Sequence, residues 1–508
     1  MTNSVDKLNV IRKTFTSCIE QLSNSKSFVS LLNNNGKLKS DFANIKNNIS
    51  PKLLTPFSDK ITVAIIGASS HGKTTIMAEM FPDLKERGWL ITDVTDTTSQ
   101  ALRIYQSKNQ SDVVINSWDI DEIKELISSS NVKSKNSADN IQIKYENNSI
   151  EVDGSEAKID KKLSSKFKFS TTQSIKPFVK PHVIPDKDIN DDFIKILTTK
   201  QQAHEVTSKS FLPVGDTSYT SLQLRTIIKD ISLTAEYTKL EKWVSEIRDE
   251  ETKSRHYDLL QKLIFIDTPG LGESGSQKDE ILSNILQYKS HHIAFNLLKK
   301  DELDMIINLV KCNEKTTLYS LLESLEKNHG EFQDLGERII LAINGVNLMF
   351  GNKEMREHIE KGDHFQTILE DNIIKKLHPK KHIKPSKICF IDSKSAVEEK
   401  VNIFSRKKDY SYFYENQKEE MEQWIEPNTA SYDYLKKLGI AESFAENIKC
   451  LINPTDCGQG FLIRQLLDSV DKNYDGMLVK KYLVRTNLLQ QYGQLVNILE
   501  RYYDNEGQ

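Results

Sequence analysis

Four residues between positions 67 and 74 have the types and the spacing needed to bind phosphate. Gly67 and Gly72 are separated by four residues, and Lys73 and Thr74 follow directly. Glycine allows the backbone to curl so that successive N–H groups face an anion, and a helix that starts here adds its positive end. In such a loop the lysine reaches the β- and γ-phosphates of a nucleoside triphosphate, and the threonine hydroxyl binds Mg²⁺. The spacing therefore predicts a P-loop that binds a nucleotide together with Mg²⁺.

The flanks of this loop have the composition that a P-loop requires. The β-branched run Ile61–Ile66 predicts a buried strand before the loop, and good helix formers follow it. The alternative, a chance glycine-rich turn with a surface lysine, does not account for both flanks. The predicted catalytic residues of the loop are Lys73, Ser69 and Ser70, and the predicted nucleotide-binding residues are Gly67, Ser70, His71, Gly72, Lys73, Thr74 and Thr75.

A polar, threonine-rich stretch lies just before the next predicted strand, Ala101–Tyr105. In nucleotide switches, a threonine at this place contacts Mg²⁺ and the γ-phosphate and releases them after hydrolysis. We expect Thr98 to have this role, as a metal-binding and catalytic residue, and Thr97 is the next candidate. The alternative is a threonine-rich turn whose hydroxyls cap the backbone.

A second phosphate-sensing loop is predicted where a buried strand ends in Asp267-Thr-Pro-Gly270. An aspartate at this place holds the Mg²⁺ shell through water, and the glycine N–H meets the γ-phosphate. Residues 273–277 are rich in glycine and serine, which predicts a mobile second switch. We therefore expect Asp267 to serve the metal and Gly270 to serve the nucleotide.

Two later strand ends fall where a guanine base would bind. One strand ends in Asn344 and Asn347, at the place of a guanine-binding Asn-Lys-x-Asp motif. Another is followed by Ser393 and Lys394, which resemble the short loop that backs the base. Asn347 offers a neutral carboxamide in place of a carboxylate, which should weaken guanine affinity about 10- to 100-fold. We expect these four residues to bind guanine with reduced specificity.

Composition and charge limit the classes of protein to consider. The 508 residues give room for two to four domains, and a net charge of −3 is too near neutral to indicate nucleic-acid binding. The five cysteines lack metal-ligand spacing, which favours reduced thiols in a cytosolic protein. No secretory signal is visible and no apolar run approaches the length of a membrane span. We expect a cytoplasmic protein, and peripheral contact with a membrane stays open.

Strands that alternate with helices predict an α/β fold, a doubly wound and mostly parallel sheet of the P-loop NTPase kind. Residues 106–262 exceed what a minimal switch domain needs and predict a large insert. Within it, Ile141–Tyr145 and Ile150–Val152 have the pattern of a β-hairpin.

One stretch of this insert, Lys158–Lys180, carries seven lysines against one acidic residue, with phenylalanines between them. Lysines interleaved with aromatic residues suit contact with anionic lipid headgroups or with single-stranded nucleic acid. A solvated loop is the simpler interpretation. Nucleic acid is the partner that we expect least.

Both ends of the chain carry apolar stripes at helical spacing, and these stripes are Leu8, Ile11, Phe15, Cys18 and Leu22 at the start and Leu488, Tyr492, Leu495, Leu499 and Tyr502 at the end. We expect them to meet in a small helical bundle, although each could instead pack separately on the sheet. The predicted domains are 1–56 (N-terminal helices), 57–400 (nucleotide domain) and 401–508 (C-terminal helices).

In the order of its motifs the chain resembles the dynamin-superfamily GTPases, and more narrowly the bacterial dynamin-like proteins of the LeoA type. The resemblance rests on the P-loop from Gly67 to Thr74, the Thr98 loop, the Asp267–Gly270 motif and the helices at both ends. It implies a GTPase domain joined to a helical bundle, dimerisation across the nucleotide face, and often polymerisation on membranes.

The chain departs from that pattern at four places. Ser69 stands where dynamins usually place a glutamine that orients water, and the helical part after residue 400 is short. In the base motif, Gly345 replaces the lysine and Asn347 replaces the aspartate. The resemblance implies Mg²⁺-dependent GTP binding and hydrolysis to GDP, coupled to assembly with a second copy or a dynamin-like partner and to membrane remodelling. The alternatives are a nucleotide-gated protein-interaction module with little turnover and a P-loop NTPase with relaxed base specificity.

Overall fold

The computed structural model of the chain divides into two compact units, Met1–Ile61 with Val470–Gln508, and Thr62–Ser469. The domain boundaries expected at residues 56 and 400 stay predictions. The residues that the structure describes are 4–49, 59–68, 71–90, 100–107, 112–119, 122, 142–146, 149–153, 173–175, 181–198, 211–214, 217–220, 227–270, 289, 292–294, 296–297, 302–311, 336–345, 387–392, 426, 433, 436, 441–451, 453, 456–486 and 493–501.

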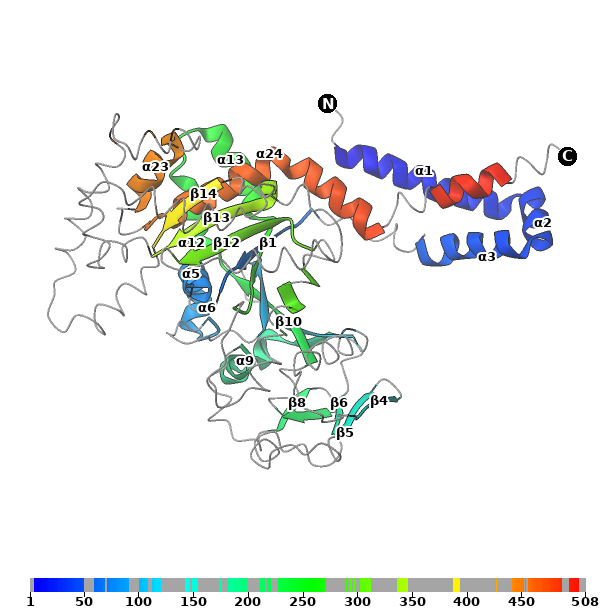
Figure 1. Ribbon diagram of the computed structural model, residues 1–508, viewed down its shortest axis with the longest axis horizontal. Helices are drawn as coiled ribbons and strands as arrows, with labels where there is room; N and C mark the ends of the chain where they lie inside the picture. Colours follow the sequence, from blue (N-terminus) through cyan, green and yellow to red (C-terminus); the bar gives the residue numbers. More distant parts are fainter. Residues whose placement is uncertain are drawn as a thin grey trace. The chain divides into compact units, whose positions relative to one another are not determined.

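The larger unit is built around a nine-stranded sheet in the order β14-β13-β12-β1-β11-β2-β10-β3-β7 (Figure 1). Its strands are β1 (Ile61–Ile66), β2 (Ala101–Gln106), β3 (Val113–Ser117), β7 (His182–Ile184), β10 (Ile228–Ala235), β11 (Leu263–Asp267), β12 (Met305–Lys311), β13 (Ile339–Asn344) and β14 (Lys387–Ile391). The strands predicted at 61–66 and 101–105 are confirmed within a residue or two, as are those predicted to end at Asp267, at Asn344 and before Ser393.

Strand direction changes across the sheet. Strands β1, β12, β13 and β14 pair in parallel, and β2 pairs in parallel with β10. Antiparallel pairs join β11 to β2, β10 to β3 and β3 to β7. All residues of β1 and β13 are buried, as expected for central parallel strands covered on both faces. The mixed α/β fold with a mostly parallel sheet is therefore confirmed.

Helices pack on this sheet, with α5 against β11 and α23 against β14. The helices of the larger unit are α5 (Lys73–Met80), α6 (Pro82–Glu86), α9 (Asp191–Thr198), α12 (Thr238–Ser245), α13 (Glu250–Leu260), α23 (Ala441–Leu451) and the first part of α24 (Gln459–Thr486), with short 3₁₀ turns at Asp186–Asp188 and Gly336–Arg338. Among the described residues, no helix is both long and apolar enough to cross a bilayer.

Two small sheets lie outside the main one. Strands β4 (Gln142–Glu146) and β5 (Ser149–Asp153) form the predicted antiparallel hairpin, and β6 (Gln173–Ile175) extends it. Strands β8 (Phe211–Val214) and β9 (Thr217–Thr220) form a second hairpin. Since β3, β7 and β10 belong to the main sheet, part of the stretch 106–262 that the sequence presents as an insert contributes to the central fold.

The smaller unit holds helices from both ends of the chain. These are α1 (Ser4–Asn24), α2 (Lys26–Asn34), α3 (Gly36–Asn44), a π-helical turn at Ile45–Ile49, the second part of α24 and the helical residues 493–501. Helices α2 and α3 are separated by a one-residue junction at Asn35, whose side chain accepts a hydrogen bond from Leu38 N–H. A similar junction at Ser25 separates α1 from α2, and the Ser25 hydroxyl accepts a hydrogen bond from Phe28 N–H.

One apolar cluster joins the two ends of the chain. Its buried members are Phe15, Ile19, Phe28, Leu32, Leu38, Phe42 and Ile45 from the start and Leu495 and Ile498 from the end. Figure 1 shows the blue and red helices of this unit side by side. The expectation for Ile11 was wrong, because its side chain is 45% exposed. Residues Leu488, Tyr492 and Tyr502 lie outside the described residues, and a complete bundle stays a prediction.

Candidate nucleotide site

The predicted site lies at one edge of the sheet. Because β1, β12, β13 and β14 are parallel, their carboxyl ends meet at this edge, which is where α/β sheets bind ligands. Gly67 follows β1 directly, at a tight contact with the neighbouring strand. A Cβ atom on Gly67 would lie 2.3 Å from the carbonyl oxygen of Leu309 in β12. Only glycine fits at position 67, because any Cβ atom would collide with the main chain of β12.

The second glycine of the loop, Gly72, starts helix α5. Its φ of 89° lies in the left-handed region that favours glycine. Its carbonyl accepts a hydrogen bond from Ile76 N–H at 3.0 Å, so the helix begins immediately after it. Thr75 lies half-buried in the first turn of the same helix. Strand β1 and helix α5 thus stand before and after the loop as the sequence predicts.

The side chain of Lys73 folds back onto the start of the loop that precedes it. The side chain is 6% exposed, and Nζ donates to the carbonyl oxygens of Ala68 at 2.8 Å and Gly67 at 3.1 Å. Both acceptors are neutral main-chain groups, so these hydrogen bonds position the ammonium without cancelling its charge. The positive charge therefore lies at the carboxyl end of β1, beside the positive end of α5.

Thr74 and Asp267 come together from motifs that lie 193 residues apart in the sequence. The Thr74 hydroxyl donates to Asp267 Oδ2 at 3.0 Å, and Asp267 is fully buried at the end of β11. Hydroxyl and carboxylate oxygens are the hard ligands that Mg²⁺ prefers, and a buried carboxylate is stabilised by a cation. This oxygen pair fits the metal that the sequence predicts.

Thr268 was not singled out by sequence, although it ties the second loop to the strand before the P-loop. Its hydroxyl donates to the Ile65 carbonyl oxygen at 2.7 Å. Gly270, at the end of the same described stretch, is buried. Thr268 therefore ties the Asp267–Gly270 motif to β1. A threonine directly after Asp267 is the sequence signal that could have indicated this contact.

The strand ends predicted to bind the base are linked to the P-loop. Asn344 Nδ2 donates to the His71 carbonyl oxygen at 2.9 Å. The His71 side chain is buried, and its Nδ1 atom lies 3.0 Å from the Leu309 carbonyl oxygen. Gly345 N–H donates to the Ile391 carbonyl oxygen at 3.1 Å, and its φ of 78° again requires glycine. Asn344 therefore ties the end of β13 to the predicted P-loop.

The start of α24 is a feature of this edge that the sequence did not place. Gln459 Nε2 donates to Glu79 of α5 and to the Asp392 carbonyl oxygen, the latter at 3.2 Å. Gly458 has a φ of 78°, and a Cβ there would lie 2.3 Å from the Phe390 carbonyl oxygen. The glycine before a helical pattern is the signal that could have indicated this close contact between α24 and β14.

Several predicted site residues lie outside the described residues, and for them the roles stay predictions. They are Ser69, Ser70, Thr97, Thr98, Asn347, Ser393, Lys394, residues 273–277, and most of the stretch Lys158–Lys180. The structure brings together the remaining predicted residues of the P-loop with Asp267 and Asn344.

No protein-family model matches the chain, and a search of curated proteins finds no match. Among solved structures it is similar to two chains of an oligomerised bacterial dynamin pair, described as sensing and tethering membranes over long range. The TM-scores are 0.34 and 0.31, the identities are 12% and 13%, and the matches cover 97% and 98% of this chain. The chain spans about half the length of those proteins, since 53% and 54% of them are covered.

Proposed function

We propose that the chain is a dynamin-like P-loop GTPase, of the LeoA type, that binds GTP with Mg²⁺ and hydrolyses it to GDP. The observation that carries the proposal is the meeting of Lys73, Thr74 and Asp267 at the carboxyl edge of the sheet. A buried lysine on its own loop, together with a threonine–aspartate pair, has the chemistry of a triphosphate and metal site. A surface lysine on a chance turn would have neither the burial nor the pair.

The residues act by position and charge. Lys73 would donate to phosphate oxygens in place of, or together with, the carbonyls of Gly67 and Ala68. Thr74 and Asp267 would hold the metal between them, and when bound Mg²⁺ neutralises charge on the phosphate oxygens. Phosphoryl transfer needs little covalent participation from the protein, so donors fixed in a buried loop are sufficient to favour the transition state.

We expect slow hydrolysis because of the residue types at the predicted catalytic positions. Ser69 stands in place of a water-orienting glutamine, and Ser70 and Thr98 are the other predicted catalytic residues. A serine hydroxyl is shorter than a glutamine amide and reaches less far toward a γ-phosphate. We assign guanine binding to Asn344, Asn347, Ser393 and Lys394, with weakened specificity.

Assembly and membrane contact extend the same proposal. The two similar solved structures are described as an oligomerised pair that tethers membranes. By analogy, this chain would form a homodimer, or pair with a related dynamin-like protein, and would contact membranes peripherally. The alternative is a nucleotide-gated interaction module with little turnover, which Ser69 and the altered base motif favour.

The first test is nucleotide binding and turnover with Mg²⁺ across GTP, GDP, ATP and XTP, using the full chain. Lys73→Ala is the blank, and Lys253→Ala, which removes a surface lysine paired with Glu250, is the matched control. We expect Lys73→Ala to lose at least about 100-fold in GTP affinity because charge-assisted hydrogen bonds to phosphate are lost.

The possible results distinguish the GTPase from the two alternative functions. GTP preference with turnover supports the GTPase, and liposome stimulation would then support assembly on membranes. Binding without turnover, unchanged by lipid, selects the gated module. Equal binding of ATP and GTP selects relaxed base specificity. No difference between the wild type and Lys73→Ala overturns the nucleotide site.

A further inference from the structure

One buried side chain, Gln459, is hydrogen-bonded to both sides of the candidate nucleotide site. Its Nε2 atom donates to the Glu79 carboxylate of α5 and, at 3.2 Å, to the Asp392 carbonyl oxygen, and the residue is 1% exposed. Within the described part of the chain, its Oε1 atom is buried and accepts no hydrogen bond. A leucine would fill this space without burying an unpaired oxygen, which indicates that the two donated hydrogen bonds matter more than packing.

The first of these acceptors belongs to the helix that carries the predicted phosphate-binding residues. Helix α5 begins with Lys73 and Thr74, and Glu79 lies on its second turn. Glu79 is 8% exposed, and a buried carboxylate is costly unless donors satisfy it. The helix is only eight residues long, and its main-chain hydrogen bonds make it move as one body. A change in the position of Glu79 therefore changes the position of Lys73 and Thr74.

The second acceptor belongs to the strand ends on the predicted base side of the site. Asp392 directly follows β14, and Gly345, directly after β13, donates its N–H to the last residue of β14 at 3.1 Å. Asn344, the last residue of β13, donates from Nδ2 to the His71 carbonyl oxygen at 2.9 Å. The contacts therefore run from α5 through Gln459 to β14 and β13, and they return to the predicted P-loop at His71.

The turn that carries Gln459 is itself fixed against β14. The Asp392 N–H donates to the Cys457 carbonyl oxygen at 2.9 Å, and the Asp456 carboxylate accepts a hydrogen bond from Gly460 N–H at 2.8 Å. Cys457 has a φ of 52°, which few residues other than glycine adopt, so this turn has a defined shape. The main chain at Gln459 thus moves with β14, and its side chain provides a link to α5.

We propose that Gln459 is a positioning residue that sets the spacing between the phosphate half of the site (Lys73 and Thr74 on α5) and the base half (Asn344 on β13). The inference rests on the proposed nucleotide function and deepens it. A nucleotide contacts both halves at once, so its affinity depends on their spacing, whereas a ligand that reaches one half does not sense it. Gln459 acts through its two acceptors and does not touch the nucleotide.

The test compares two ligands of Gln459→Leu in the full chain with Mg²⁺. GTP reaches both halves of the site, and inorganic tripolyphosphate carries the phosphate chain without a base or a ribose. We expect the affinity for GTP to fall about tenfold and the affinity for tripolyphosphate to stay within about twofold of the wild type. Calorimetric titrations of wild type and variant, well below both melting temperatures, measure the two affinities.

Variants at the partner residue show whether the bridge itself is responsible. Glu79→Leu should reproduce the effect of Gln459→Leu, because a bridge fails when either end is lost, and it serves as the test if Gln459→Leu does not fold. Glu79→Gln keeps an acceptor for Nε2 and should retain GTP affinity within about threefold. The double variant with leucine at both positions should lose no more affinity than Gln459→Leu, because the same link is already broken.

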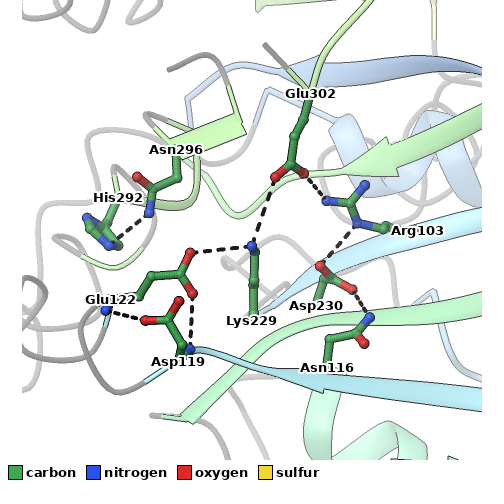
Figure 2. Close-up of polar contacts among 9 residues, drawn as sticks. All are labelled: Arg103, Asn116, Asp119, Glu122, Lys229, Asp230, His292, Asn296 and Glu302. Atoms are coloured by element: carbon green, nitrogen blue, oxygen red, sulfur yellow. Dashed lines mark hydrogen bonds and ion pairs between the residues drawn. The ribbon is translucent and has the colours of Figure 1, made fainter. Parts of the chain in front are cut away.

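A polar cluster in the same unit, drawn in Figure 2, supplies the matched control. Asn116 Nδ2 on β3 donates to the buried Asp230 carboxylate at 2.6 Å, and three strands lie between β3 and β1 in the sheet. Asn116→Leu removes a polar contact of the same kind far from α5 in strand order. It should lower the melting temperature and leave the affinities for GTP and tripolyphosphate within about twofold of the wild type.

The outcomes separate this inference from the proposed function. If the wild type binds GTP and both Gln459→Leu and Glu79→Leu bind it equally well, the positioning is overturned and the nucleotide site stands. An equal loss of affinity for GTP and tripolyphosphate in both variants also overturns it, in favour of a general structural role. If the wild type binds GTP no better than Lys73→Ala, the inference and the proposed function fall together.

Discussion

Gly67, the first glycine of the predicted P-loop, lies close to the neighbouring strand β12. A Cβ there would meet the Leu309 carbonyl oxygen at 2.3 Å, a distance that real Cβ atoms do not adopt. The main chain of β12 cannot move aside without disturbing its pairing with β1 and β13. The same Leu309 carbonyl faces the ring of His71. The residue type at position 67 is therefore decided by the neighbouring strand as well as by the curl of the loop.

Gly67→Ala is expected to shift the loop, to destabilise the larger unit by about 2–4 kcal/mol and to abolish measurable GTP binding. The matched control is Gly476→Ala, in the interior of α24, where a Cβ would meet nothing within 4 Å. That substitution should stabilise the chain by about 0.5–1 kcal/mol, because alanine favours the helix. Urea unfolding and GTP titration of both variants check the pair, and normal GTP binding by Gly67→Ala would contradict the close contact.

At the scale of elements, β14 is one of the two outer strands of the nine-stranded sheet, and helix α23 packs against it. Asn447, fully buried on α23, accepts a hydrogen bond from Phe390 N–H at 2.6 Å and donates to the Phe390 carbonyl oxygen at 2.9 Å. The Phe390 ring packs edge-on against Phe444 at 5.1 Å. One side chain thus occupies both main-chain groups of an edge residue, which removes them from pairing with another strand.

Asn447→Ala should destabilise the larger unit by about 2–4 kcal/mol, because it leaves a buried N–H and a buried C=O without their partner. Lys449→Ala, at an exposed position of the same helix, is the control and should change stability by less than about 0.5 kcal/mol. Thermal unfolding measures the difference, and size-exclusion chromatography should show more aggregate for Asn447→Ala. Equal melting temperatures for the two variants would argue against the role of Asn447.

At the scale of the whole molecule, the chain folds as two units, and the smaller one is assembled from both termini. Its cluster places Phe28 and Phe42 with ring centroids 5.0 Å apart, and Leu495 and Ile498 complete it from the C-terminal side. The ends of the chain are therefore interdependent for stability.

Phe28→Ala and Leu495→Ala should both lower the same unfolding transition, by about 3–5 and 2–5 kcal/mol, because each leaves a cavity in one shared cluster. GTP affinity should stay within about twofold, since the site lies in the other unit. Differential scanning calorimetry with GTP titration checks both statements. Val10→Ala, at a side chain that is 62% exposed, is the control. A Leu495→Ala variant with an unchanged transition would show that the two ends pack separately.

The sequence by itself determined the features that are formed by consecutive residues. The run Ile61–Ile66, the loop to Thr74 and the helix after it form a local unit, and the Asp267-Thr-Pro-Gly270 turn follows its own strand, so period and residue type were sufficient to find them. The apolar strands of the sheet were found in the same way. The short strands β3 and β7 were not, because their antiparallel partners, rather than their own pattern, make them strands.

Only the tertiary structure decided which distant residues meet. The Thr74–Asp267 pair was expected from two motifs, whereas Gln459 with Glu79, Asn447 with Phe390, and the contact of Gly67 with Leu309 had no local signal. The order and register of the strands set these contacts, and register is fixed by packing across the whole sheet. The pattern of residues along a segment predicts its secondary structure. The partner of a buried polar group can be identified only once the strands and helices have packed together.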